Sequence, residues 1–219
     1  MITLPPTTEA AEQLQTELAP RVIRTAPPDF DPPTATGLDV AYAKHDNRVA
    51  AAAVTIDMAT GTILARATAV GEATFPYTPG LFAFRELPTL LKALAQLPSP
   101  DLLIADGHGL AHPRRFGLAC HLGIETNLPT IGVAKTPMGD YAEPGPERGD
   151  TSQLTDDTEQ VGVALRTRRG TKPVFVSIGH RIDLATATSL VLRLSHYRLP
   201  ETTRQADQLS RRTLRAALS

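Results

Sequence analysis

An apolar run near the middle of the chain is followed at once by a carboxylate and a glycine. Residues 102–105 read Leu-Leu-Ile-Ala, with Pro100 shortly before them, which is typical of a short strand buried on both faces. Asp106 is therefore expected at the carboxyl end of that strand, where open α/β sheets bind their ligands. The polar residues that follow are His108, His112, Arg114 and Arg115. An isolated Asp-Gly pair usually only starts a turn, but this loop offers an acid for a cation and donors for a phosphate.

Three further carboxylates stand out by their surroundings. Asp39 lies in the strand-like run 36–43, on a face of small side chains. Glu86 lies beside the apolar stripe of the helical segment 81–97, so it must be paired, bind a metal or point into a cleft. Asp207 lies on the last predicted helix, which is rich in arginine. A charged terminal helix most often only faces solvent. Asp207 is therefore a candidate metal ligand only if the fold brings it close to the other acids.

Carboxylates held close together repel one another unless a cation lies between them. Hard oxygen ligands with open positions for water suit Mg²⁺, and Mn²⁺ can substitute for it. Such an ion polarises a phosphate and generates hydroxide. Motifs for other chemistries are absent from the sequence: CxxC, HExxH, a Gly-rich Walker loop and G-x-S-x-G. The pattern therefore favours magnesium chemistry on a phosphate over zinc, P-loop or serine chemistry.

A proline-rich segment, residues 74–80, precedes the helical segment of Glu86. Pro76 and Pro79 fix its backbone and hold Tyr77 and Thr78 between them. A stiff aromatic tip of this kind is what nucleic-acid enzymes insert into a base stack. The alternative is a rigid connector whose tyrosine packs inward.

The hydrophobic pattern predicts an α/β fold, with a mixed sheet flanked by helices. Three antiparallel strands in a meander are expected at 36–43, 48–58 and 62–70. A parallel strand at 129–134 would bring Lys135 to the same sheet edge as Asp106. Further strands are predicted at 161–166 and 174–178, and helices at 7–19, 81–97, 115–123, 184–194 and 201–218.

A single domain is expected over residues 1–219, because the sequence shows no internal repeat and no low-complexity segment. Residues 1–35 should form a helix and an extended lead-in, since prolines between positions 27 and 33 forbid regular structure. Residues 138–157 are rich in Pro, Gly, Asp and Glu and are predicted to be a surface loop.

Composition and charge limit the class of protein. Hydrophobic residues make up 42% of the chain, and no apolar run approaches the ~20 residues of a membrane span. A cytoplasmic location without a membrane partner is expected, since the start of the sequence lacks the layout of a signal peptide. The single cysteine, Cys120, excludes an internal disulfide. A net charge of -1 argues against a protein that binds nucleic acid through a basic surface all over the molecule. A polyanion would have to bind to a local basic patch or to a metal ion.

A series of motifs resembles the endonuclease V family, the metal-dependent deoxyinosine-directed nucleases with an RNase H-like fold. They are Gly37-Leu-Asp-Val40, Phe75-Pro-Tyr-Thr-Pro-Gly80, Phe84-Arg-Glu-Leu-Pro88, Asp106-Gly-His-Gly109 with His112-Pro-Arg-Arg115, Gly132-Val-Ala-Lys135, Gly179-His-Arg181, and Tyr197-Arg-Leu-Pro200 followed by Thr203-Arg204 and Ala206-Asp207. The motifs occur in the family's order. The resemblance implies an RNase H-like fold and a DNA repair endonuclease that uses Mg²⁺ and acts on deoxyinosine.

The resemblance also implies roles for individual residues. The catalytic residues would be Asp39, Glu86, Asp106 and Lys135, with Asp207 as a fourth metal ligand at a position where family members have His or Asp. The substrate-binding residues would be Pro76, Tyr77, Thr78 and Pro79 as a strand-separating wedge, Gly80, Gly109 and Gly132 as walls of a pocket for an extruded base, and His112 and Arg114 as donors.

The implied reaction is hydrolysis of the second phosphodiester bond 3′ to the lesion, leaving a 3′-hydroxyl and a 5′-phosphate. Thr78 departs from the Ile that the family favours, which should weaken the apolar part of the wedge. The expected partner of this monomer is DNA that contains deoxyinosine. One alternative is a nuclease of the same fold acting mainly on inosine in RNA, or on mismatched or branched DNA. Another is a lesion-binding module without catalysis, but a pure binder has no need of mutually repelling carboxylates.

Overall fold

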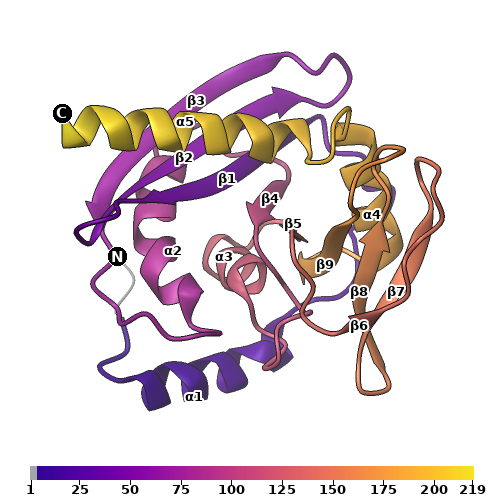
Figure 1. Ribbon diagram of the computed structural model, residues 1–219, viewed down its shortest axis with the longest axis horizontal. Coiled ribbons are helices and arrows are strands. Elements are labelled where there is room, and N and C mark those ends of the chain that lie inside the picture. Colours follow the sequence, from indigo (N-terminus) through magenta and orange to yellow (C-terminus); the bar gives the residue numbers. More distant parts are fainter. Residues whose placement is uncertain (1–3) are drawn as a thin grey trace.

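The computed structural model describes residues 4–219 and contains one mixed sheet with helices on both faces (Figure 1). The strand order is β3-β2-β1-β4-β5-β9-β8-β7-β6. The strands are β1 (Thr34–Tyr42), β2 (Arg48–Asp57), β3 (Ile63–Glu72), β4 (Leu103–Asp106), β5 (Thr130–Ala134), β6 (Asp140–Tyr141), β7 (Thr151–Asp156), β8 (Glu159–Leu165) and β9 (Val174–His180). The helices are α1 (Thr8–Leu18), α2 (Phe82–Leu94), α3 (Leu118–Thr126), α4 (Leu184–Leu194) and α5 (Glu201–Leu218), with a short 3-10 turn at Ala19–Arg21.

The predicted fold class is confirmed. β1, β2 and β3 form the expected antiparallel meander, and β1, β4 and β5 are mutually parallel neighbours. β9 then pairs antiparallel with β5. Because parallel strands end at one edge of a sheet, the carboxyl ends of β4 and β5 lie together and bring Asp106 and Lys135 side by side.

The helices cover the sheet in two layers. Apolar residues of α2 and α3 pack with Leu38, Leu103 and Ala105 on one face. On the other face, α4 packs with β5, β8 and β9, and α5 packs on β1 and β2. α1 lies outside the α2 and α3 layer, at the bottom of Figure 1, where Ala11 and Leu14 contact Phe84. The carboxylates on β1 and β4 can therefore be approached by side chains from both helical layers.

Gly37 sets how closely α5 approaches β1. A Cβ at this position would lie 2.2 Å from the carbonyl carbon of Thr202, at the start of α5. Any larger residue would push the helix off the strand, because a backbone atom cannot move aside as a flexible side chain can. Two residues further along the strand is Asp39, so this contact also holds α5 close to the acid.

Two predictions about local structure are wrong. Residues 138–157 are not a loop throughout, because β6 and β7 extend the sheet at its far edge. There Leu154 is buried, and the rings of Tyr141 and Phe175 lie 4.9 Å apart. The strand pattern was weak because Leu154 is the only apolar residue of β7. The helix predicted from residue 115 begins at Leu118, since Arg115 has a φ of 55°, which a right-handed helix cannot contain.

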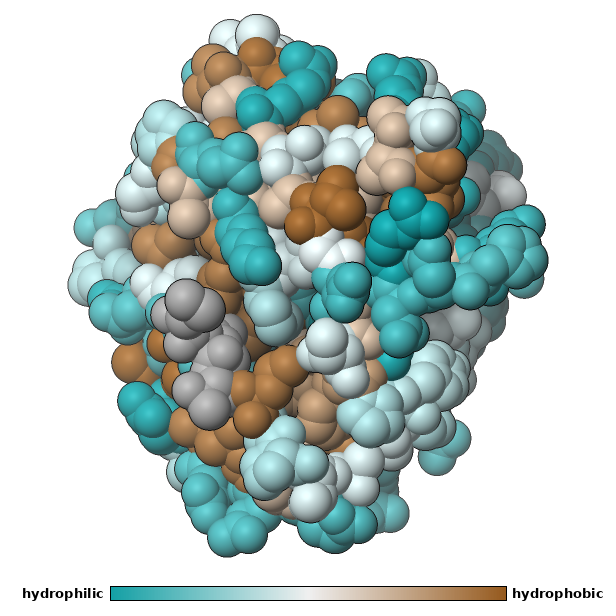
Figure 2. Space-filling model, turned by 90° about the vertical axis from the view of Figure 1, so that its left-hand side faces the viewer, coloured by the Kyte–Doolittle hydropathy of each residue, from teal (hydrophilic) through white to brown (hydrophobic). Residues whose placement is uncertain are grey.

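None of the helices within residues 4–219 is both long and apolar enough to cross a membrane. Figure 2 shows the face on the left of Figure 1, where hydrophilic side chains are widely spread and hydrophobic ones form small patches, more of them in the lower half.

Candidate active site

Two carboxylates lie next to each other on neighbouring parallel strands. Leu38 of β1 pairs with Ala105 of β4, so the residues that follow them, Asp39 and Asp106, are adjacent at the edge of the sheet. Asp39 is buried, at 9% exposure, while the side chain of Asp106 is 20% exposed. The strands therefore present one buried and one accessible carboxylate at the same point.

Glu86 and Asp207 approach this pair from the two helical layers. Glu86 is half-buried on α2, and Asp207 is half-buried on α5. The charges of Asp106 and Asp207 raise the pKa of Asp39, and the charges of Asp39 and Asp106 raise the pKa of Glu86. The structure thus brings together the four acids that the sequence singled out.

Each acid has a hydrogen-bond donor beside it. Ser210 Oγ donates to Asp39 Oδ2 at 2.6 Å, and Tyr42 Oη donates to Glu86 Oε1 at 3.1 Å. The other two acids are held by cations: Asp106 Oδ2 by Lys135 Nζ, and Asp207 Oδ1 by Arg211 Nη2 at 2.9 Å. Sequence reasoning missed Ser210, Tyr42 and Arg211. A usable signal was present for the α5 residues, because positions three and four after Asp207 share its helical face.

Burial decides the protonation of two of these acids. Burial raises the pKa of Asp39 to about 7, with the charges of Asp106 and Asp207 adding to it and the Ser210 hydrogen bond opposing it. Burial likewise raises the pKa of Glu86 to about 8, against the Tyr42 hydrogen bond. Lys135 has a raised pKa: burial lowers it, but the contact with Asp106 outweighs that effect. The acids are crowded and short of positive charge.

A divalent cation fits this set of donors. As the side chains stand, no group of three His, Cys, Asp or Glu residues within 4–219 is arranged to hold a metal ion. However, Asp39 has the charges of Asp106 and Asp207 near it, and Glu86 has those of Asp39 and Asp106 near it. Lys135 pairs with Asp106, and Arg211 pairs with Asp207. Carboxylate oxygens are the ligands that Mg²⁺ prefers. Burial is the main cause of the raised pKa values of Asp39 and Glu86, and a cation would offset both burial and the repulsion that adds to it.

The acids lie between two hollows. The first has a volume of about 400 Å³, and its lining includes Gly80, Phe82, Glu86, Asp106, His112 and Lys135. The second, also of about 400 Å³, is lined by Asp39, Val40, Ala41, Tyr42, Asp207, Arg211, Leu214 and Arg215. A molecule in the first hollow would therefore lie directly beside Asp106 and Lys135, with the second hollow on the far side of the acids. We refer to the first hollow as the base cavity, after the extruded base that the sequence analysis expects to be bound near Gly80.

The carbonyl oxygen of Gly80 is held at the rim of the base cavity by three donors. Gln15 Nε2 lies 3.0 Å from it, His112 Nε2 2.8 Å and Arg114 Nη2 3.4 Å. His112 Nδ1 accepts a hydrogen bond from the backbone N–H of Arg114 at 3.1 Å, so the ring proton is on Nε2. Burial lowers the pKa of His112 to about 4, which keeps the ring neutral. Gln15, which the sequence did not single out, thus ties α1 to the rim.

Arg114 was predicted to be a donor to the substrate, but the structure commits it to the protein. Arg114 Nε donates to Gln15 Oε1 at 2.7 Å, and Nη1 lies 3.2 Å from Glu12 Oε1. Its guanidinium is therefore occupied in holding α1 and Gly80. A substrate contact would have to break these bonds.

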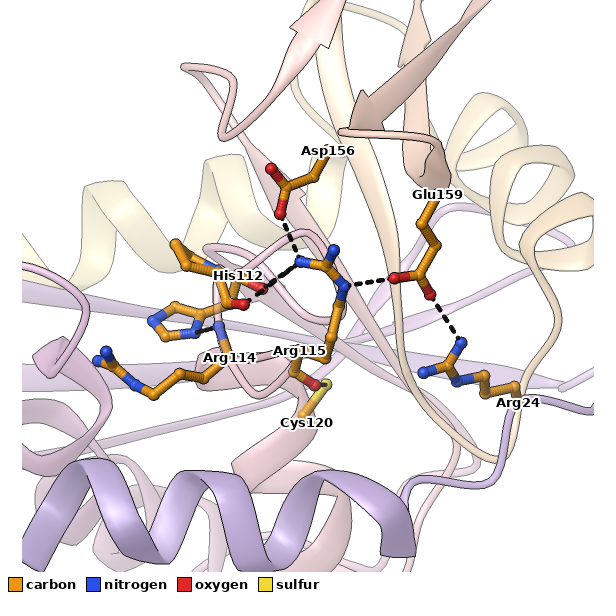
Figure 3. Close-up of polar contacts among 8 residues, drawn as sticks. Arg24, His112, Arg114, Arg115, Cys120, Asp156 and Glu159 are labelled. Atoms are coloured by element: carbon orange, nitrogen blue, oxygen red, sulfur yellow. Dashed lines mark hydrogen bonds and ion pairs between the residues drawn. The ribbon is translucent and has the colours of Figure 1, made fainter.

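Arg115 is committed in the same way, as Figure 3 shows. Its guanidinium lies between Asp156, with Nη1 2.7 Å from Oδ2, and Glu159, with Nε 2.6 Å from Oε2. Glu159 also contacts Arg24, at 3.2 Å. These ion pairs fasten the loop that carries His112 to the turn between β7 and β8.

Gly109 and Gly132 were predicted to line the base pocket, but they are not among the residues that line the base cavity. A Cβ at Gly109 would lie 2.0 Å from the carbonyl oxygen of Ile178. A Cβ at Gly132 would lie 2.6 Å from both the Gly107 carbonyl oxygen and the Gly109 nitrogen. Both glycines let backbone segments pack together beneath the loop of Asp106, so they support the cavity without forming its walls.

The proline-rich segment points its tyrosine outward. Tyr77 is 71% exposed, and its ring lies edge-on to Phe82, at a centroid distance of 5.2 Å, and 5.9 Å from the guanidinium carbon of Arg85. Both ends of the segment are anchored: Phe75 is buried against Phe84, and Gly80 is held as described above. The segment is thus a fixed projection with an aromatic tip next to the base cavity.

The crowded acids predict a pH dependence of stability in metal-free protein. Asp39 and Glu86 have ordinary values of 3.8 and 4.5, raised to about 7 and about 8 by burial. Between about pH 4 and pH 8 the native state therefore holds protons that the unfolded state has lost. The free energy of unfolding should fall as the pH rises through this window, by up to about 1.4 kcal/mol per pH unit for each group.

The variant Asp39→Asn should flatten this decline and be more stable than the parent protein at pH 8, because the amide carries no charge to bury. Denaturant unfolding in EDTA at several pH values measures the effect, with Asp140→Asn, an exposed position on β6, as the matched control. A pH profile of Asp39→Asn that parallels the parent profile would show that Asp39 titrates normally in the native protein.

The sheet, with acids at its carboxyl edge, defines a nuclease with an RNase H-like fold, as solved relatives of the same architecture show. A sequence model of the endonuclease V family matches residues 16–208. The chain therefore belongs to the endonuclease V family.

Individual relatives agree with this assignment. The endonuclease V of Nocardia farcinica is 56% identical over 220 residues, covering 99% of this chain and 96% of the relative. The crystal structure of endonuclease V from Streptomyces avermitilis superposes with a TM-score of 0.93 at 53% identity, covering 99% of this chain and 96% of that one. Endonuclease V of Ciona intestinalis, 26% identical with a TM-score of 0.85 and coverage of 96% and 99%, was crystallised with a 23mer DNA containing an inosine followed by a ribo-adenosine.

Proposed function

We propose that this protein is a Mg²⁺-dependent endonuclease that recognises deoxyinosine in DNA and hydrolyses the second phosphodiester bond 3′ to it, leaving a 3′-hydroxyl and a 5′-phosphate. The observation that carries this proposal is the position of the base cavity, which is lined by two of the four acids, Glu86 and Asp106, and by Lys135. The Ciona relative, crystallised with inosine-containing DNA, supports the choice of base.

The acids have the central part in this reaction. Asp39, Glu86, Asp106 and Asp207 would hold Mg²⁺, for which Mn²⁺ can substitute, and when bound the ion polarises the phosphate and lowers the pKa of a nearby water. Ser210 orients the buried Asp39 carboxylate, and Tyr42 orients Glu86. Lys135 Nζ lies at Asp106 Oδ2 and can move to the phosphoryl oxygens as negative charge develops on them.

The base cavity would select the base by shape. Hypoxanthine lacks the exocyclic amino group of guanine, so a close-fitting wall can admit one and exclude the other. Gly80 forms part of that wall: its φ is 81°, and a Cβ would lie 2.8 Å from Arg114 Nη2 and 3.2 Å from His112 Nε2. Because the base occupies the cavity beside the acids, the phosphate that reaches the acids need not be the lesion's own.

The segment from Pro76 to Pro79 would act as the wedge that replaces the extruded base. Tyr77 is exposed at its tip and Thr78, which is half-buried, adds a polar group where Ile would be more apolar. Taking a base out of a duplex costs a few kcal/mol, which an inserted aromatic ring offsets in part.

Tyr77→Ala should therefore weaken recognition of inosine in duplex DNA by far more than in single strands, where no stacked partner must be separated. The cut should stay at the same bond. Measuring kcat/KM on matched duplex and single-stranded oligonucleotides checks this, with Tyr141→Phe as a control that keeps the ring in the core. Equal losses on the two substrates would mean that Tyr77 supports the fold or the cavity and is not a wedge.

One experiment tests the proposed function as a whole. The protein is incubated with and without Mg²⁺ on labelled DNA containing one deoxyinosine, on the same DNA with adenine, and on an RNA with inosine. Cutting of the deoxyinosine strand at the second bond on the 3′ side, only with Mg²⁺, is the expected result. Preference for the RNA or for mismatched DNA would support the alternative nuclease, and binding without cutting would support a lesion-binding module.

A further inference from the structure

Unmatched cations lie on the same edge of the sheet as Lys135. β5, β9 and β8 are antiparallel neighbours, so the end of β5, the start of β9 and the end of β8 share this edge, where Ala134 pairs with Phe175 and Leu165 with Val174. Lys172 comes shortly before β9 and Arg168 shortly after β8, and both are exposed. Neither has an ion pair with a carboxylate of residues 4–219.

Arg198 joins these cations to the active site. Its Nη2 donates to the carbonyl oxygens of Lys135, at 2.9 Å, and Pro173, at 3.0 Å, and its Nε donates to that of Lys172, at 3.1 Å. The hydrogen bonds fix the half-buried guanidinium between the end of β5 and the start of β9. All its bonds go to carbonyl groups, so its positive charge is not matched by any carboxylate in the described part of the chain.

Tyr197, beside Arg198 in the link between α4 and α5, gathers two more guanidiniums. The carbon of the Arg204 guanidinium lies 5.2 Å from the ring centroid and that of Arg168 lies 5.9 Å from it. Arg204 is paired with Glu201, whereas Arg168 has no ion pair with a carboxylate of residues 4–219. Tyr197 is 52% exposed, so an aromatic ring and cations from three separate segments meet at the surface.

We propose that this region binds the phosphate backbone of the substrate DNA outside the base cavity and the acids. It consists of Arg168, Lys172, Tyr197, Arg198 and Arg204, and we refer to it as the arginine-tyrosine surface. The proposal rests on the proposed nuclease function and adds to it a second contact region, continuous with Lys135.

The charge pattern favours a nucleic-acid backbone as the occupant. The whole chain has a net charge of -1, so three unmatched cations on one stretch of edge are a local excess of positive charge. Guanidiniums held in place by carbonyl groups and by a ring lose little entropy on binding phosphate. Backbone contacts of this kind position a duplex without reading its sequence, so they should act on DNA with or without inosine.

The test is the salt dependence of binding, measured with the double variant Arg168→Ala/Lys172→Ala. Each phosphate contact contributes about 0.9 to the slope of log K against log salt, so removing two contacts should lower the slope by about 2. At 0.1 M salt the affinity for a long duplex should fall roughly tenfold or more. The matched control is Arg66→Ala/Lys92→Ala, which removes the same charge from exposed positions on β3 and α2 and should leave the slope unchanged.

Measuring both inosine-containing and inosine-free duplexes separates this proposal from the proposed function. Equal loss of slope on both duplexes supports the surface, even if inosine were not preferred by the parent protein. The same measurement is made on duplexes shortened on one side of the inosine or on the other. The difference in affinity between parent and variant should vanish when one particular side is removed. An unchanged slope, or a loss shared with the control variant, would overturn the proposal, as would a loss that persists whichever side is removed. The proposal would also be overturned if the double variant bound DNA like the parent protein and had lost binding only to an acidic protein.

Discussion

Replacing Asp106 or Asp39 with alanine is expected to abolish Mg²⁺-dependent cleavage while leaving the fold and most of the DNA binding. Asp39 and Asp106 are adjacent on neighbouring strands, and either change removes one carboxylate of this pair. The charge stabilisation that a metal ion provides is worth several kcal/mol, so the single-turnover rate should fall at least about 10³-fold. Asp39 does not line the base cavity, Asp106 is one lining residue among many, and the Tyr77 projection contains neither, so affinity for inosine-containing DNA should largely remain.

The measurements are the single-turnover cleavage rate with Mg²⁺ and the dissociation constant without it. Asp140→Asn serves as the control for loss of a carboxylate on the same molecule. Asp207→Ala should cause a milder defect, because Asp207 stands on α5 at a position where the family that the motifs resemble has either His or Asp. Mg²⁺-dependent cutting retained by both Asp39→Ala and Asp106→Ala would contradict the metal assignment, and a loss for Asp207→Ala as complete as for Asp106→Ala would contradict the ranking.

Replacing Lys135 with alanine is expected to lower the cleavage rate by roughly 30- to 1,000-fold, corresponding to about 2 to 4 kcal/mol of lost transition-state stabilisation. Lys135 contacts Asp106 and lines the base cavity, and its pKa is raised because the contact with Asp106 outweighs burial. It is therefore charged when substrate binds and can follow the charge that develops on the phosphoryl oxygens.

The rate at saturating DNA and the affinity separate the possible roles of Lys135. A fall in the rate at saturation with little change in affinity is the expected result. Loss of affinity alone would make Lys135 a positioning contact, and no change in either would make it an ordinary surface lysine. Lys92→Ala, on the far end of α2, controls for the loss of one positive charge.

Much of the architecture could be predicted because local patterns report local structure. The apolar run at 102–105 corresponds to β4, and the alternation at 36–43 corresponds to β1. The arginine-rich segment that follows Pro200 is α5, from Glu201 to Leu218. The unbroken apolar run of β4 reports burial on both faces, the alternation at 36–43 marks β1, and Pro200 marks the start of α5. The edge strands β6 and β7 were not predicted, because few of their residues are buried and their hydrophobic alternation is weak.

The identities of the acids also follow from the amino-acid order, since a carboxylate at a strand end or beside an apolar stripe is costly without a partner. Asp39, Glu86 and Asp106 could each be singled out by their surroundings. Asp207, on a charged helix, became a candidate only together with these acids, and the resemblance of the motifs to endonuclease V implied one metal site for all four. The resemblance could not say which neighbouring polar groups would hold them.

Only the tertiary structure decides those partners, because they come from segments far apart in the chain. Ser210 reaches Asp39 across 171 positions, and Gln15 reaches Gly80 across 65. The same long-range packing turns Arg114 and Arg115 toward carboxylates and amides of the protein, and places Gly109 beneath the base cavity instead of in its wall. Hydrophobic periodicity reports which face of an element is buried, but a side chain's partner depends on which other elements pack there.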